Sequence, residues 1–68
     1  MRDDELFRLA GCQAIAETTA GLRVLLPSGR CVWLPKSQIH EDSEVYALET
    51  SGILVVPAWL AAAEDLDA

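Results

Sequence analysis

The sequence predicts a β-rich α+β domain: a four- or five-stranded antiparallel sheet, either curled or forming a small, partly open barrel, with one C-terminal helix. Three observations lead to this prediction. Short apolar runs alternate with turn-forming Gly, Pro, Ser and Thr residues, a β-branched run at 53–56 lies between Gly52 and Pro57, and residues 58–66 are rich in helix formers. With 68 residues, 51% of them hydrophobic, the chain has enough apolar surface for one small domain.

Within this single domain, 1–68, the sequence separates three parts. Residues 1–10 are acidic and then apolar, and they fit one helical turn or the start of a strand, so this segment need not be fixed to the sheet. Residues 12–56 are expected to form the antiparallel sheet, and residues 57–66 the helix.

The first strands are predicted from their turns. The partly alternating segment 12–18 is followed by turn residues at 18–21 and by the apolar segment 22–26, which indicates a hairpin. The next turn is predicted at Pro27-Ser28-Gly29, because proline has a preset φ and glycine accepts a positive φ. The chain can therefore reverse there, from the strand 22–26 into the strand 30–34. We therefore expect three strands in meander order.

Two further strands are expected in the second half. Pro35 has no N–H for a strand ladder, so the third strand should end there or lie at a sheet edge. Polar loops enclose the segment 44–48, which fits a short strand. The run 53–56 is the clearest strand of the chain, and its uninterrupted apolar character predicts a central position, buried on both faces.

The C-terminal helix is predicted to begin at Pro57, which suits the first helical turn. An apolar stripe at i, i+3, i+4 and i+7 should face the sheet. It consists of Trp59, Ala62, Ala63 and Leu66. Acidic residues at 64, 65 and 67 oppose the helix dipole, so the last turn is expected to fray.

Charge and cysteine content restrict the function classes. The net charge of −6 makes direct binding to nucleic acid or anionic lipid unfavourable. The carboxylates either solvate the surface or, if gathered on one face, imitate a phosphate backbone. With no long apolar run and no signal-peptide pattern, we expect a cytoplasmic protein. There, Cys12 and Cys31 are expected as free thiols rather than a disulfide.

The candidate binding residues follow the third strand. Trp33 alternates with Val32 and Leu34, so it is either a core residue or a partly exposed anchor for a partner, beside Lys36. The turn that follows either presents polar groups for recognition or satisfies its own backbone. The candidate partner-binding residues are Trp33, Lys36, Ser37 and Gln38.

No enzymatic or metal chemistry is expected. Ser37 and the nearby His40 do not make a nucleophile with a positioned base. The acidic residues around His40 fit a solvated loop better than a metal site, and neither cysteine belongs to a C-x-x-C pair. We therefore expect a non-enzymatic protein with no cofactor.

Several segments together carry a resemblance. The run Val32-Trp33-Leu34-Pro35-Lys36-Ser37-Gln38-Ile39 is its most specific part, and the helix start Pro57-Ala58-Trp59-Leu60-Ala61 is another. Over residues 12–66 the chain resembles a group of short, uncharacterised proteins of phages, prophages and bacterial genomes. The resemblance implies a compact β-rich module of mobile-element origin, and that setting suggests an inhibitor of a host defence complex.

These observations favour a small protein-binding module that inhibits or modulates a host defence or nucleic-acid-processing complex. The alternative is an accessory protein that binds single-stranded nucleic acid on the sheet, through Trp33 and the arginines. A homodimer is compatible with the sequence, because a domain of this size gains burial by pairing edges or helices.

Overall fold

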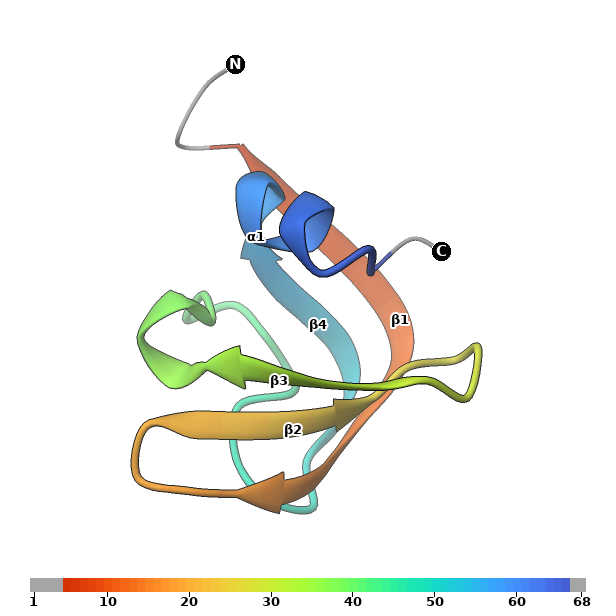
Figure 1. Cartoon of the computed structure of the whole chain (residues 1–68), viewed down its shortest axis with the longest axis vertical. Helices are drawn as coiled ribbons and strands as arrows, with labels where there is room; N and C mark the ends of the chain where they lie inside the picture. Colours follow the sequence, from red (N-terminus) through yellow and green to blue (C-terminus); the bar gives the residue numbers. More distant parts are fainter. Residues whose placement is uncertain (1–4, 67–68) are drawn as a thin grey trace.

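The fold is a curved antiparallel sheet with a short C-terminal helix, seen in a computed structural model that describes residues 5–66. Within these residues the elements are the strands β1 (Leu6–Glu17), β2 (Gly21–Leu25) and β3 (Cys31–Pro35), the 3-10 helix η1 (Lys36–Gln38), the strand β4 (Ser51–Pro57) and the helix α1 (Ala58–Ala63). The strands lie in the order β3-β2-β1-β4, and each neighbouring pair is antiparallel (Figure 1). The predicted α+β fold is confirmed as an open four-stranded sheet, because the sheet does not close into a barrel.

The first three strands form the predicted meander. In the first turn the N–H of Thr18 donates to the C=O of Gly21, and the N–H of Gly21 donates to Thr18 Oγ1, both at 2.9 Å. In the second turn the N–H of Leu26 donates to the C=O of Arg30 at 2.7 Å, and Gly29 has a φ of +94°. Glycine adopts this left-handed conformation at little cost because it has no Cβ. The tight turn sets the register in which β2 and β3 pair.

Strand β1 is longer than the sequence predicts and pairs with two neighbours. It begins at Leu6, before the expected start of the sheet at residue 12, and pairs with both β4 and β2. A register shift against β4 falls between Leu9 and Cys12, where Gly11 has a φ of +80°. Such irregularities bend a strand, which lets β1 curve around the core. Of the segment expected to be loosely held, residues 1–4 lie outside the described residues.

Strand β4 is a buried edge strand, so the predicted central position was wrong. Its described sheet neighbour is β1 alone, yet Leu54, Val55 and Val56 are all buried. Leu54 and Val56 belong to the core, and the segment 39–45 runs along the outer edge of β4. The N–H of His40 donates to the C=O of Val55 at 2.9 Å, and the N–H of Glu44 donates to the C=O of Ile53 at 2.8 Å.

The strand expected at 44–48 is absent from the described residues, which accounts for four strands rather than five. This segment forms a loop and a turn instead. Ser43, which is buried, fixes the loop: its Oγ accepts the N–H of Val55 at 3.1 Å and that of Val45 at 3.2 Å, and donates to the C=O of Val45 at 2.8 Å. The edge of β4 is therefore held partly by the backbone N–H groups of His40 and Glu44 and partly by the side chain of Ser43, without a fifth strand.

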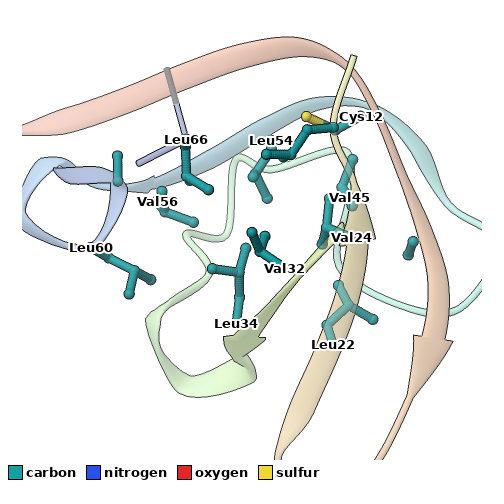
Figure 2. Close-up of a cluster of buried hydrophobic side chains, with 13 residues drawn as sticks. Cys12, Leu22, Val24, Val32, Leu34, Val45, Leu54, Val56, Leu60 and Leu66 are labelled. Carbon is teal, nitrogen blue, oxygen red and sulfur yellow. The ribbon is translucent and has the colours of Figure 1, made fainter. Parts of the chain in front are cut away.

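The core lies on the inner face of the curved sheet and beneath α1 (Figure 2). Alternate residues of the strands point into it, and Val45 joins from the loop. The labelled residues in the figure are Cys12, Leu22, Val24, Val32, Leu34, Val45, Leu54, Val56, Leu60 and Leu66. Phe7, Leu9 and Ile39 are half-buried against this cluster.

The helix buries a different face from the one predicted. Leu60 and Ala61 are buried, whereas Trp59 is 46% exposed and Ala62 and Ala63 face solvent. Leu66 is buried as expected, but it is not part of the helix. Helix α1 ends at Ala63, and residues 64–66 form a turn that carries Leu66 into the core. The predicted apolar stripe of Trp59, Ala62, Ala63 and Leu66 was therefore wrong as the buried face of the helix.

The end of α1 explains how Leu66 reaches the core. Asp65 has a φ of +53°, the N–H of Leu66 donates to the C=O of Ala61 at 3.0 Å, and the N–H of Asp65 donates to the C=O of Ala62 at 3.3 Å. This is the Schellman pattern, in which a left-handed residue folds the chain back across the last turn. Arg30, from the β2–β3 turn, donates to the carbonyls of Glu64 and Asp65 and holds this end in place.

Candidate partner-binding surface

Trp33 lies on the outer face of the sheet. Its neighbours Val32 and Leu34 are buried, while Trp33 is 49% exposed. Strand alternation requires this opposition, so burial of Leu34 settles the choice left open by the sequence, and the interpretation of Trp33 as a core residue was wrong. On the neighbouring strand Gly21 leaves space for the indole, because a Cβ built there would lie 3.4 Å from Trp33 Cε3.

Arg23 is the cross-strand neighbour of Trp33. The two residues pair directly in the β2–β3 register, and Ala16 of β1 is the next residue in the same row. Arg23 is exposed, and among the described residues no carboxylate lies within ion-pair distance of it. The outer face therefore presents an indole and a guanidinium side by side, where directly opposed residues have their Cβ atoms about 5 Å apart.

The other three candidates lie in η1, where their surroundings differ from that of Trp33. The ammonium of Lys36 forms an ion pair and hydrogen bond with Glu17 of β1. Ser37 is exposed and Gln38 is half-buried. Lys36 is thus engaged within the protein, and the part of the predicted patch that faces solvent freely is formed by Trp33 and Ser37.

Glu17 connects three segments of the chain. One carboxylate oxygen binds Lys36, and the other accepts the N–H of Leu48 at 3.0 Å. The hydrogen bond from Lys36, followed by that from Leu48, lowers the pKa of the Glu17 carboxyl below its ordinary value. The carboxylate stays ionised at neutral pH and joins β1 to η1 and to the 46–50 turn.

The 46–50 turn exposes apolar side chains that sequence analysis missed. Tyr46 is 62% exposed and Leu48 is 47% exposed. Thr50 holds the turn, because its Oγ1 accepts the N–H of Tyr46 at 3.0 Å and that of Ala47 at 3.2 Å. A signal was present in the sequence, since the polar run Glu49-Thr50-Ser51-Gly52 is typical of a turn. The expectation of a strand at 44–48 hid it.

Acidic residues flank these exposed apolar residues in the sequence. Between residues 41 and 49 all four charged side chains are carboxylates, and all four residues are exposed. They are Glu41, Asp42, Glu44 and Glu49. The segment along the outer edge of β4 and the following turn is therefore acidic, whereas Arg23, Arg30 and Lys36 lie in and around β2 and β3, and Arg8 lies on β1 opposite Val55.

The groups with potential reactivity are dispersed. The N–H of Asp42 donates to His40 Nδ1 at 3.0 Å, and an Asp42 carboxylate oxygen lies 3.7 Å from the same nitrogen. Within residues 5–66 no three His, Cys, Asp or Glu side chains converge as metal ligands, and no pocket is formed. Cys12 and Cys31 are both free thiols, and burial raises the pKa of Cys12.

No protein-family model, curated protein or solved structure matches the chain. None of the described helices is long and apolar enough to cross a membrane.

Proposed function

We propose that the protein is a small, acidic, non-enzymatic module of mobile-element origin that binds another protein, and that it inhibits or modulates a host defence or nucleic-acid-processing complex. The mobile-element origin rests on the sequence resemblance around Trp33–Ile39. The binding function rests on the outer face of the sheet.

The exposed indole of Trp33 is the observation that carries this proposal. A tryptophan that is half exposed in a regular strand keeps a large apolar surface in water, and such residues are enriched among the side chains that dominate protein interfaces. One edge of the ring lies close to Gly21 on the neighbouring strand, while the rest stays open to a partner. Arg23 beside it provides the second residue type favoured at such positions.

The charge distribution supports a partner with a basic surface. Segment 41–49 carries four exposed carboxylates beside Tyr46 and Leu48. Carboxylates attract the cationic grooves that bind nucleic acid, and the exposed apolar side chains of the same segment add contact area. A complex that processes nucleic acid offers such a groove.

Affinity capture with matched tryptophan variants tests the proposal. Three proteins are immobilised and exposed to lysate of a bacterial host: wild type, Trp33→Ala and Trp59→Ala. The temperature is kept well below the thermal midpoint of each protein. Because Trp33 and Trp59 have similar exposure, 49% and 46%, the two variants remove similar apolar surface from different elements. We expect Trp33→Ala to lose a retained protein that wild type and Trp59→Ala both keep. Equal retention by all three proteins contradicts the proposal.

One observation favours the alternative of single-stranded nucleic-acid binding: Arg23 and Trp33 lie side by side on an exposed sheet face. Bases stack on such aromatic side chains, and a neighbouring guanidinium contacts phosphate. A labelled oligonucleotide titrated at about 50 mM salt separates the two functions. Salt-sensitive binding that Arg23→Ala weakens supports the alternative, and absence of binding removes it.

A further inference from the structure

The two edges of the sheet differ in whether another segment of the chain covers them. The β4 edge is covered, because residues 39–45 hydrogen-bond to Ile53 and Val55 through His40, Ser43 and Glu44. The β3 edge has no such cover within residues 5–66. An uncovered strand edge presents unpaired N–H and C=O groups to any other extended chain.

The hydrogen-bond register shows which groups are open. The N–H of Leu26 donates to the C=O of Arg30, and the N–H of Lys36 donates to the C=O of Ala20 at 2.9 Å. The backbone N–H and C=O groups of the even-numbered residues of β3 therefore point towards β2. Cys31, Trp33 and Pro35 therefore direct their backbone groups away from the sheet. Among the described residues, nothing hydrogen-bonds to the N–H or C=O of Cys31 and Trp33 at this edge.

We propose that a second copy of this chain pairs with the β3 edge, with the two β3 strands antiparallel about a two-fold axis at Val32. In this register Cys31 of each copy exchanges both backbone hydrogen bonds with Trp33 of the other. The result is four intermolecular N–H···O bonds and a sheet that continues through the dimer. The proposal goes beyond binding of a foreign partner and does not depend on it.

Pro35 and the neighbouring charges select this register. An axis at Trp33 would place Cys31 opposite Pro35, which has no N–H to donate, and Arg30 opposite Lys36, which is a like-charge pair. With the axis at Val32, Arg30 lies opposite Leu34, and Pro35 falls outside the exchanged bonds. None of the residues from Cys31 to Pro35 is charged, so self-pairing buries no ion.

Charge distribution favours a second copy at this edge in spite of the net charge of −6. The four carboxylates of segment 41–49 lie along the other edge of the sheet and the turn beyond it. Near β3, Lys36 is neutralised by Glu17, and Arg30 binds the end of α1 beside Glu64 and Asp65. The surface around β3 thus carries paired or cationic groups, Lys36 with Glu17 and the exposed Arg23, and two copies that meet there do not bring the outer edges of β4 together.

Sedimentation equilibrium under reducing conditions tests the proposal, with samples from about 10 µM to about 1 mM, the range expected for so small an interface. We expect the mass to rise from 7.4 kDa towards twice that value with concentration. Trp33→Lys places a charge in the pairing strand and should keep the protein monomeric. Ile53→Lys is the control, since Ile53 is an exposed strand residue, 40% accessible, on the covered edge, and it should leave the dimer intact.

Nuclear magnetic resonance identifies the register. In a mixture of labelled and unlabelled protein, we expect a contact between the Hα atoms of the two Val32 residues, because this pair is not hydrogen-bonded and its Cα atoms lie about 4.5 Å apart. Amide exchange at Cys31 and Trp33 should slow as concentration rises. A mass of 7.4 kDa throughout, or a dimer that lacks the Val32 contact and survives Trp33→Lys, would overturn the proposal.

Discussion

Replacement of Ser43 by alanine tests how the β4 edge is covered. Ser43 Oγ accepts the N–H groups of Val55 and Val45, two residues that are 2% and 0% exposed, and donates to the C=O of Val45. Alanine leaves both buried N–H groups without this acceptor. A buried donor left unsatisfied costs about 1–3 kcal/mol, so we expect Ser43→Ala to lower the free energy of unfolding by about 2–4 kcal/mol.

This loss is large for so small a protein. A chain of 68 residues has a net stability of roughly 3–10 kcal/mol, and in such domains each kcal/mol shifts the thermal midpoint by about 4–8 °C. Thermal denaturation of Ser43→Ala should therefore show a midpoint at least about 8 °C below that of wild type, and urea denaturation should show a midpoint at a lower urea concentration. Ser37→Ala is the matched control, because this exposed serine makes no side-chain hydrogen bond within the described residues. Equal midpoints for the two variants would refute the reasoning.

Three further outcomes are expected. Leu34→Ala should destabilise the protein by about 2–5 kcal/mol in urea unfolding, because it opens a cavity beneath α1, and a smaller effect than that of Trp33→Ala would contradict the assigned faces. The pKa of Glu17 is lower in the folded state than in the unfolded state. The stability that its contacts contribute is therefore present above the unfolded pKa of about 4.3 and is lost as the pH falls through the lower folded pKa. In thermal midpoints measured over a pH series, Glu17→Gln should reduce this dependence on acid. Arg30→Met should speed amide exchange at Leu66, because the turn after α1 loses its cross-chain donor, and unchanged exchange would show that the Schellman turn holds by itself.

Local chemistry made the first half of the fold predictable. Gly29 takes a positive φ within a Pro-Ser-Gly turn, and Thr18 bonds across its own turn to Gly21, so each hairpin is determined by a few adjacent residues. The meander follows from these turns. The beginning of β1 was harder to predict, because the bend at Gly11 divides the strand into two short apolar patterns.

The candidate site depended on contacts that no local pattern contains. Alternation requires Trp33 and Leu34 to face opposite sides, but it does not say which side is the core. Lys36 is a candidate partner-binding residue by sequence, and in the structure it binds Glu17 on a strand brought close only by the fold. At the end of α1, the left-handed conformation of Asp65 turns Leu66 inward at a position where helical periodicity assumes a continuing helix.

The covered β4 edge and the open β3 edge have a common consequence for binding. Because the segment that covers β4 also carries the carboxylates 41–49, the acidic surface and the Trp33 surface belong to opposite edges of one sheet. Pairing at β3 would therefore place the two indoles near the centre of the dimer and give the dimer two acidic segments, one from each copy. A partner with two basic sites would then bind both acidic segments at once, and the second contact would gain from a high effective concentration. We therefore expect Trp33→Lys to weaken partner binding by more than the loss of the indole contact, because the variant also loses the dimer. Trp33→Phe keeps the β3 edge uncharged and should weaken partner binding less.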